Sequence, residues 1–441
     1  MCIRDSGGGG SASSVEGRFP DISAEPVVLW STPTHEMLGE MVDSWVDNVP
    51  DGFSLEQYLA ESGWLQLFEM DDGAVVVRPA MHEWTSSRFY AYDVRSGSQR
   101  WSGTAIPEGA QASCVPTGSA LTCLESSYRD SARLPWVNAL HTVAGADGSV
   151  RASTDLPASE EMPTLSSLDG DILVATPDVG LIQVSRLSGR DHTERWSIDV
   201  GGDSLSEVSV SERGAALNVT HEGGSSQHLL VDPSTGEAVD LPAAQREGLH
   251  SAYAWYGDLL LGQQVPGFGE PGAATVQRFA ADGEQLWSVR TDGGFARPQH
   301  VEPGAPVLTV TAAASPTIVT ALHPVDGREL WTYVGRESYA HLVFATPDEV
   351  GVVDGERLVV LEATSGVERW SERSALDSVR ISPQHLYGVE RDGTVKAFRL
   401  SDGSTAWSLP PEDGLNEGYT RLVDIHGTVF VVRGDRLTAI G

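Results

Sequence analysis

The sequence predicts an all-β protein, a single β-propeller of four-stranded antiparallel blades, and three observations support this. A turn glycine is followed four residues later by a tryptophan, after a short run of strand-forming residues. From Trp101 onward, the tryptophan or its equivalent recurs every 37 to 51 residues or so, close to the period of a propeller blade. Long helical periodicity is almost absent. The five regular pairs are Gly97–Trp101, Gly283–Trp287, Gly327–Trp331, Gly366–Trp370 and Gly403–Trp407.

The stretch Arg357–Ser371 illustrates the repeating unit. Leu358–Leu361 is an apolar strand, and the turn after it ends in Gly366, which can adopt a positive φ at little cost. Trp370 then lies on the returning strand. Because one hairpin cannot bury an indole, each tryptophan needs a neighbouring unit to pack against. We therefore interpret the tryptophans as residues that dock successive blades.

Three copies of the unit are irregular. Trp196 follows Gly189 with three extra residues in the turn. Ala152 and Asp240 stand where a tryptophan is expected. We predict that changes at these two positions affect stability much less than changes at the tryptophans.

The pattern of a strand, an Asp or Thr, a glycine, three residues and a tryptophan resembles the tryptophan-docking repeat of the pyrroloquinoline-quinone (PQQ)-like β-propellers. That superfamily includes the quinoprotein alcohol dehydrogenases and the BamB-like outer-membrane assembly lipoproteins. The resemblance covers about Pro26 to Gly441. It implies a fold but says little about function, because one fold hosts many functions. The docking positions it implies are Trp30, Gly97, Trp101, Trp196, Gly283, Trp287, Gly327, Trp331, Gly366, Trp370, Gly403 and Trp407.

The two ends of the repeat region predict how the ring closes. Pro26–Ser31 reads as a lone outer strand with Trp30 in the docking position and no turn before it. Thr420–Ile440 holds three strand signals and no tryptophan strand after them. We predict that the N-terminal strand completes the last blade, which leaves no raw sheet edge. This count gives nine units, whereas the resemblance implies eight; we predict eight blades, with nine as the alternative.

Two segments do not follow the repeat. Residues 1–25 are a Gly/Ser-rich linker in which Met1–Ser6 look foreign, and we expect that a signal peptide or membrane anchor preceded it. Residues 34–63 form an insertion before the first full blade of the domain at 26–441. Apolar residues at helical spacing in Met37–Val46 and a second segment, Phe53–Leu59, predict two short helices. The insertion is either a flap packed on the propeller or a partner-docking or channel-covering element.

Two of the three cysteines, Cys114 and Cys123, lie on predicted neighbouring strands. They form either a disulfide, which would suit an oxidising compartment, or a pair of buried free thiols. Cys2 belongs to the foreign-looking start. No CxxC spacing predicts zinc.

The net charge is −33 and the pI is about 4.5, and Lys396 is the sole lysine. This balance argues against nucleic acid or an anionic membrane surface as a partner. It is either an adaptation for solubility or an acidic docking face for a cationic partner.

Catalytic motifs are absent from the sequence, so we predict no catalytic, cofactor-binding or metal-binding residue. Asp71-Asp72-Gly73 and Asp169-Gly170-Asp171 could in principle hold a cation, but Asp-Gly is also the commonest tight-turn pair. Quinoprotein dehydrogenases hold their cofactor against a disulfide of consecutive cysteines. This sequence has no Cys-Cys pair, so no functional residue of those enzymes can be assigned here.

These observations predict a non-catalytic, monomeric propeller outside the cytoplasm, tethered to a membrane through the missing N-terminal anchor. We expect it to act as a binding or assembly scaffold for a protein or peptide. The alternative is a ligand-sensing or carbohydrate-binding ectodomain, and a PQQ-dependent dehydrogenase is the third hypothesis.

Overall fold

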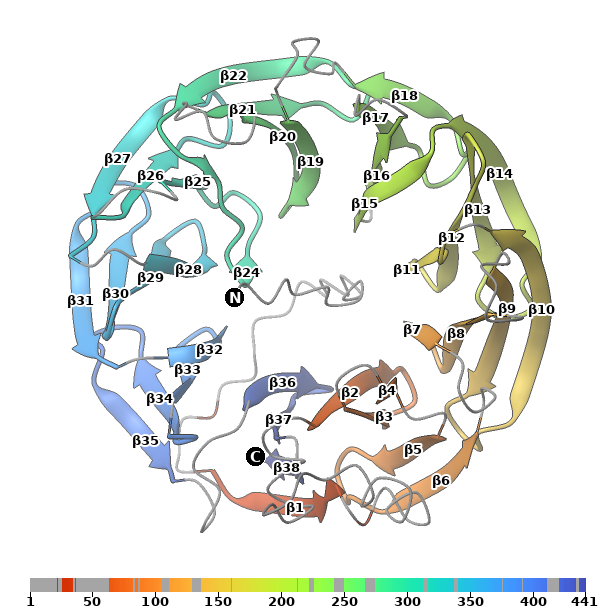
Figure 1. Cartoon of the computed structure of the whole chain (residues 1–441). Helices are drawn as coiled ribbons and strands as arrows, with labels where there is room; N and C mark the ends of the chain where they lie inside the picture. Colours follow the sequence, from red (N-terminus) through yellow and green to blue (C-terminus); the bar gives the residue numbers. More distant parts are fainter. Residues whose placement is uncertain are drawn as a thin grey trace, which may run out of the picture.

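The architecture comes from a computed structural model of the whole chain. It describes residues 22, 26–34, 36, 63–81, 84–85, 88–104, 111–128, 136–159, 161–211, 213–221, 226–241, 250–265, 274–311, 316–336, 340–374, 376–390, 392–410, 420–433 and 436–441. The described strands form nine sheets arranged as a ring (Figure 1). The prediction of eight blades was therefore wrong, and the alternative of nine is confirmed. The two units without a tryptophan are complete four-stranded blades.

The blades are numbered in chain order. Blade 1 holds β2 (Gly63–Met70), β3 (Ala74–Met81), β4 (Trp84–Thr85), β5 (Arg88–Asp93) and β6 (Gln99–Thr104). Blade 2 holds β7 (Gln111–Thr117), β8 (Ala120–Tyr128), β9 (Trp136–Ala144) and β10 (Val150–Ser159). Blade 3 holds β11 (Thr164–Leu168), β12 (Asp171–Asp178), β13 (Leu181–Ser188) and β14 (Glu194–Gly201). Blade 4 holds β15 (Ser204–Ser211), β16 (Gly214–Thr220), β17 (Ser226–Val231) and β18 (Ala238–Leu241).

The second half of the ring repeats the same order. Blade 5 holds β19 (His250–Tyr256), β20 (Leu259–Val265), β21 (Ala274–Phe279) and β22 (Gln285–Thr291). Blade 6 holds β23 (Gly294–Phe295), β25 (Val307–Val310), β26 (Ile318–Leu322) and β27 (Glu329–Val334). Blade 7 holds β24 (His300–Val301), β28 (Ala340–Ala345), β29 (Glu349–Asp354), β30 (Arg357–Glu362) and β31 (Glu368–Arg373). Blade 8 holds β32 (Leu376–Ile381), β33 (His385–Glu390), β34 (Val395–Arg399) and β35 (Thr405–Leu409). Blade 9 holds β36 (Arg421–Ile425), β37 (Thr428–Val432), β38 (Arg436–Ile440) and β1 (Val28–Pro33).

The ring closes as predicted, because β1 is the outer strand of blade 9. It pairs antiparallel with β38, with Trp30 opposite Ala439 and Pro33 opposite Arg436. The first and last strands of the chain thus share one sheet (Figure 1). The predicted helices at Met37–Val46 and Phe53–Leu59 lie outside the described residues.

One feature of the ring was not predicted. The connection from β23 to β25 in blade 6 crosses to the inner edge of blade 7, where β24 pairs parallel with β28. Next to it, the side chain of Gln299 accepts a hydrogen bond from the Val379 amide of blade 8, at 3.2 Å. This connection therefore braces three consecutive blades on the channel side.

The two ends of the ring differ in their connections. At one end, which we call the short-turn end, tight turns join the first to the second and the third to the fourth strand of a blade. At the other end, the long-connection end, lie the turns between second and third strands and the links between blades.

Candidate functional site: the seams between blades and the tip of blade 3

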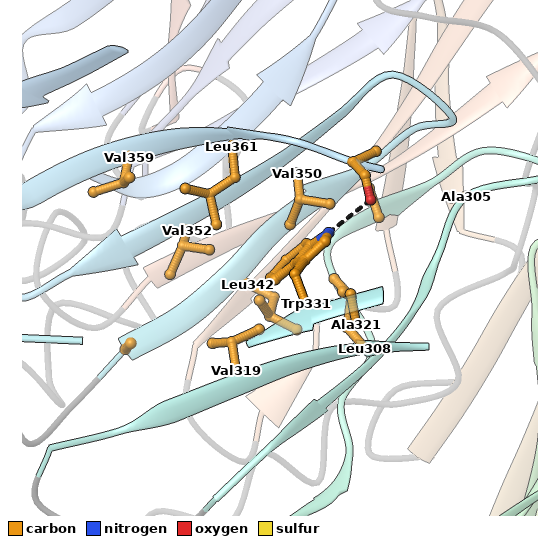
Figure 2. Packing of buried hydrophobic residues seen from close by; sticks show 13 residues of the cluster. Ala305, Leu308, Val319, Ala321, Trp331, Leu342, Val350, Val352, Val359 and Leu361 are labelled. Atoms are coloured by element: carbon orange, nitrogen blue, oxygen red, sulfur yellow. Dashed lines mark hydrogen bonds between the residues drawn. The ribbon is translucent and has the colours of Figure 1, made fainter. Parts of the chain in front are cut away.

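We call each interface between consecutive blades a seam, and most seams are packed around one tryptophan of an outer strand. At the seam of blades 6 and 7, Trp331 lies in the middle of a buried apolar cluster (Figure 2). Its Nε1 donates to the carbonyl oxygen of Ala363, at 2.7 Å. A Cβ added to Gly366, whose φ is +69°, would lie 2.6 Å from the indole. The indole thus occupies the space that a side chain at Gly366 would need.

Five further seams repeat this arrangement. In each, the tryptophan Nε1 donates to the carbonyl three residues before a positive-φ glycine of the next blade, and that glycine covers the indole. The pairs are Trp30 with Gly97, Trp101 with Gly148, Trp196 with Gly236, Trp287 with Gly327, and Trp370 with Gly403.

A β-bulge directs each tryptophan toward the next blade. In blade 7, Trp370 lies opposite Val360, and the next pair joins Glu368 to Leu361, so Arg369 is the extra residue. The bulge changes the face to which the strand's side chains point. The same shift precedes the tryptophan in the other docking strands.

At the seam of blades 8 and 9, the N-terminal segment replaces the missing turn. Trp407 Nε1 donates to the carbonyl oxygen of Ile22, at 2.8 Å. The amide of Ile22 donates to the hydroxyl of Tyr387, at 2.7 Å. The same docking hydrogen bond is therefore made although no turn precedes β1.

The seam of blades 2 and 3 has exchanged both partners of the docking pair. The strand of blade 2 keeps its bulge but carries Ala152. In blade 3 the left-handed turn position belongs to His192, with φ +59°, and its amide donates to Ser188 at 2.9 Å. His192, rather than Gly189, precedes Trp196 by the usual four residues. The repeat is thus regular here, with histidine in place of glycine.

The His192 side chain fills the space that an indole occupies elsewhere. Its Nε2 lies 2.8 Å from Thr142 Oγ1, and its Nδ1 lies 3.0 Å from Thr154 Oγ1. The Thr142 hydroxyl also donates to the carbonyl of Gly189, which stands where the tryptophan's acceptor would be. Buried hydroxyls continue the chain to Thr122, 2.8 Å from Thr142. Burial lowers the pKa of His192.

The seam of blades 4 and 5 lost its tryptophan in another way. The described pairing of β18 shows no bulge, since His228, Leu229 and Leu230 pair in turn with Leu241, Asp240 and Val239. Val239, not Asp240, therefore faces Gly283: its Cγ1 lies 2.9 Å from where a Cβ of that glycine would be. The position taken as equivalent to tryptophan in the sequence was displaced because the strand lacks the extra residue.

A polar ladder crosses blade 4 beside this seam. Asn218 Nδ2 donates to Glu207 Oε2, at 3.1 Å, and Asn218 Oδ1 lies 2.6 Å from His228 Nδ1. The His228 ring packs against Tyr253 of blade 5, with centroids 4.5 Å apart. The side chain is buried, and its Nε2 has no hydrogen-bond partner among the described residues. Burial lowers the pKa of His228 to about 4.

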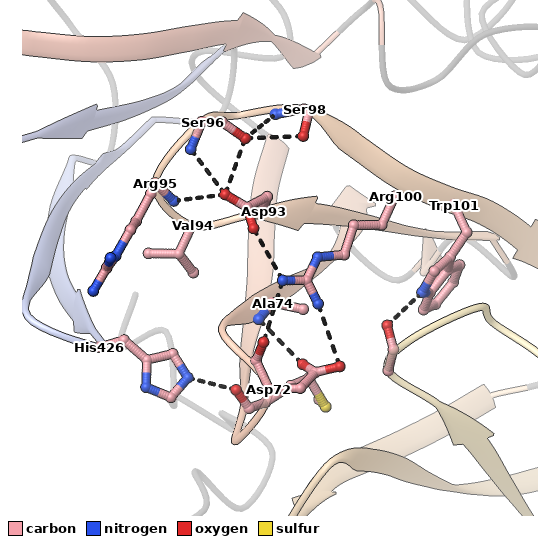
Figure 3. A network of polar contacts seen from close by, with 12 residues as sticks. Asp72, Ala74, Asp93, Val94, Arg95, Ser96, Ser98, Arg100, Trp101 and His426 are labelled. Carbon is pink, nitrogen blue, oxygen red and sulfur yellow. Dashed lines mark hydrogen bonds and ion pairs between the residues drawn. The ribbon is translucent and has the colours of Figure 1, made fainter.

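At the seam that closes the ring, between blades 9 and 1, polar contacts lie beside the apolar cluster that contains Trp30, Leu65 and Phe430, and His426 of this seam is drawn in Figure 3. His426 Nε2 contacts the Met70 carbonyl of blade 1. Asp424 is partly buried beside Glu69, and burial and the neighbouring carboxylate raise its pKa to about 6. Asp424 Oδ1 has no hydrogen-bond partner within the described part of the chain.

The acidic turns considered as cation sites are occupied by basic side chains. Arg100 lies 3.3 Å from Asp72 and 3.0 Å from Asp93 (Figure 3). Hydrogen bonds from Ser96 and Arg100 lower the pKa of Asp93 to about 2. Arg186 lies 2.9 Å from Asp171. Over the described residues, no group of three or more His, Cys, Asp or Glu is placed to hold a metal ion.

Cys114 and Cys123 lie directly opposite each other on β7 and β8 and form a disulfide. Both belong to the apolar cluster at the seam of blades 1 and 2. The structure therefore joins the two cysteines that the sequence left open between a bridge and free thiols.

Apolar side chains are exposed at the long-connection end of blade 3. Val179 is 74% exposed at the turn between β12 and β13, and Leu181 and Met162 are 39% and 40% exposed. We call these residues and the exposed acids around them the blade 3 tip. The acids are Glu161, Asp178, Asp199 and Asp203, and the stretches 161–163, 175–183 and 198–205 contain no Lys or Arg. Sequence reasoning missed this surface, because exposure depends on the packing of the blade.

Comparison with known proteins supports the resemblance seen in the sequence. Residues 272–441 match a family model described as outer membrane protein assembly factor BamB. The chain is similar to the BamB-like β-propellers. The matched part contains the four consecutive tryptophan-docked seams from blade 5 to blade 9.

Solved structures are similar to the chain at low sequence identity. BamB from Moraxella catarrhalis is 12% identical, with 94% of this chain and 99% of that chain covered and a TM-score of 0.42. A eukaryotic initiation factor is 13% identical, with 80% and 88% covered and a TM-score of 0.57. Sqt1 of Saccharomyces cerevisiae is 11% identical, with 72% and 92% covered and a TM-score of 0.41. Of these three structures, the initiation factor alone has a TM-score above 0.5. At 13% identity it supports the propeller fold and says nothing about function.

No curated protein matches the chain. The helices of the described residues include none with the length and apolar character that crossing a bilayer requires.

Proposed function

We propose that this BamB-like propeller is a non-catalytic scaffold outside the cytoplasm that binds a protein partner through the blade 3 tip. The observation that carries the proposal is the exposure of Val179, with Leu181 and Met162, on one blade. Exposed apolar side chains grouped within a polar surface are typical of sites of protein association. Val179 is more exposed than any other large apolar side chain identified as exposed in the described structure.

The charge around the tip indicates the chemistry of the partner. Four exposed carboxylates border the apolar residues, without a neighbouring Lys or Arg in the three stretches that form the tip. We infer a partner whose apolar patch is surrounded by basic residues. Such pairs associate faster at low ionic strength, because opposite charges steer the encounter.

The disulfide supports the proposed location. Disulfides persist in oxidising compartments. The Cys114–Cys123 disulfide belongs to the buried apolar cluster between blades 1 and 2. The Gly/Ser-rich residues before Pro26 would act as a spacer between the propeller and a membrane anchor. The anchor remains part of the proposal.

A pair of matched positions tests the binding surface. A photo-crosslinking amino acid would be placed at Val179 and, as a control, at Val367, which is 60% exposed in a turn at the short-turn end. In the native host, we expect position 179 to yield one discrete adduct that position 367 does not. Asp substituted at Leu181 should reduce the adduct at position 179. Equal adducts at both positions, or none at 179, would contradict the proposal.

A further inference from the structure

Two seams of the described ring lack a docking tryptophan, and they lie on either side of blades 3 and 4. The seams are those of blades 2 and 3 and of blades 4 and 5. Between them, blades 3 and 4 (residues 164–241) are joined to each other by Trp196 and Gly236. Each of the two exceptional seams holds one buried histidine, His192 or His228. We infer that blades 3 and 4 form a sector whose two outer seams loosen on acidification. This inference does not depend on the proposed partner surface.

At the first seam, the histidine is held by hydroxyl groups of the neighbouring blade. Thr142 and Thr154, both of blade 2, contact the two ring nitrogens of His192. With a neutral ring, one nitrogen donates and the other accepts, and the Thr142 hydroxyl can donate onward to Gly189. A protonated ring would donate from both nitrogens and would place a charge at a site that is 6% exposed.

At the second seam, only one ring nitrogen of the histidine has a hydrogen-bond partner, so the surroundings accommodate only the neutral ring. His228 Nδ1 donates to Asn218 Oδ1, so the buried Nε2 carries the lone pair and faces no acceptor among the described residues. Protonation would create a buried N–H without a partner, next to the ring of Tyr253 in blade 5. Separation of blade 5 from blade 4 would remove this ring and let water reach Nε2.

The charged groups around both rings do not offset the added charge. His141 of blade 2 acts against protonation of His192 and is itself paired with Glu125, at 2.8 Å. Asp191 favours protonation of His192, but less than burial and His141 oppose it. Around His228, Asp240 acts in the same weak sense and Glu207 is separated from the ring by Asn218. In the described structure, no carboxylate contacts either ring.

The direction of the pH effect follows from these environments. Both histidines bind a proton more weakly in the closed ring than in water, so an opened seam takes up protons first as the pH falls below about 6.5. For His228, a pKa of about 4 when closed and about 6.5 when solvated makes opening roughly 20- to 30-fold more favourable at pH 5.0 than at pH 7.5. The tryptophan–glycine contacts contain no titratable group and should not share this response.

Hydrogen–deuterium exchange of the full chain tests the inference. Exchange would be measured at about pH 7.5 and pH 5.0, with labelling times scaled for the intrinsic pH dependence of amide exchange. We expect amides of blades 3 and 4 at the two seams to lose about tenfold or more of their protection at the lower pH. Amides at the seams of blades 6, 7 and 8 serve as the internal control. An equal loss around the whole ring would overturn the inference.

Neutral replacements make the test specific. The His192→Gln, His228→Gln double variant keeps side chains that can hydrogen-bond but removes both titrating groups. Its two seams should show less than a threefold difference between the two pH values, and a response as large as in the original protein would overturn the inference. If the variant does not fold, the histidine ring signals of the unmodified protein are titrated by nuclear magnetic resonance. Values near 6.5 for both rings would also overturn it, whereas lowered values support it.

Discussion

The seam of blades 6 and 7 and the seam of blades 2 and 3 solve the same packing problem in opposite ways. In the first, Trp331 supplies the volume and Gly366 supplies the space. In the second, Ala152 supplies the space and His192 fills it from the other side. The backbone is the same at both, with a bulge on one strand and a left-handed turn on the other. A docking pair is therefore a shared volume, and either blade can occupy it.

The two kinds of seam are distributed unevenly along the chain. The four seams from blade 5 to blade 9 all contain a docked tryptophan, and the BamB-like family model matches residues 272–441 there. The two seams without a docking tryptophan lie earlier in the chain, at blades 2 to 5. The regular seams of blades 1 and 2 and of blades 3 and 4 also lie outside the matched residues, and the nine blades of the described ring are all complete.

The largest expected effect is the loss of an indole from a regular seam. Trp370→Ala should lower the free energy of unfolding by about 3 to 5 kcal/mol, because it leaves a cavity between blades 7 and 8 and removes the hydrogen bond to Leu400. Denaturant unfolding measures this change. Ala152→Ser and Asp240→Asn should each cost about 1 kcal/mol or less. Equal shifts at all three positions would contradict the docking role of the tryptophan.

A glycine substitution tests the other side of the shared volume. Gly366→Ala should cost about 2 to 4 kcal/mol, since it combines left-handed strain with a Cβ placed 2.6 Å from the indole of Trp331. Gly180→Ala is the matched control: its φ is +66°, but nothing lies within 4 Å of the added Cβ. It should cost about 1 kcal/mol, the strain alone. If thermal unfolding shows equal losses for both variants, contact with the indole does not explain the need for glycine.

Two substitutions can convert the seam of blades 2 and 3 into a regular tryptophan–glycine seam. Ala152→Trp should clash with His192, and His192→Gly should leave a cavity and remove the ring nitrogen that Thr154 contacts, so each single variant should be destabilised. The double variant restores a tryptophan–glycine pair, with the Gly189 carbonyl already at the acceptor position. We expect a favourable coupling of about 1 to 3 kcal/mol in a double-mutant cycle by denaturant unfolding. Additive losses would show that the two positions do not share one volume.

The regular seams could be predicted from the sequence because they depend on local rules. A turn glycine, a bulge and a tryptophan lie within a few residues, so their spacing survives in the chain. The closure of the ring by the strand that carries Trp30 was predicted by counting strands, because the last blade lacks its tryptophan strand and the first strand lacks a blade. The exchanged seams could not be recognised, since Ala152 and His192 come from different blades and only packing shows that they are partners. The four-residue offset from His192 to Trp196 does indicate the turn position, but it is hidden when only glycine is expected there.

Other features depend on contacts distant in the sequence. β24 is too short to give a pattern of its own and is defined by its pairing with the next blade. Val179 resembles any strand residue until the blade leaves it exposed at a turn. The acidic composition was evident from the sequence, but its arrangement around the blade 3 tip required the fold.

The smallest expected effect concerns the closing seam, where the carboxylates of Asp424 and Glu69 lie beside the apolar cluster. Burial and Glu69 raise the pKa of Asp424 to about 6, so between its unfolded value of 3.8 and about 6 the unfolded state loses the proton first. The ring is therefore destabilised as the pH rises through this window, and the cost is fully present above it.

Asp424→Asn removes the charge and should stabilise the protein by about 1 to 2 kcal/mol at pH 7.5, a figure reduced for partial exposure. Near pH 4 the change should be close to zero. Thermal unfolding at both pH values measures the difference, with Asp402→Asn, in an exposed turn, as the control expected to show no gain. A gain that is independent of pH would mean that the substitution acts through packing or hydrogen bonding, not through the charge at the closing seam.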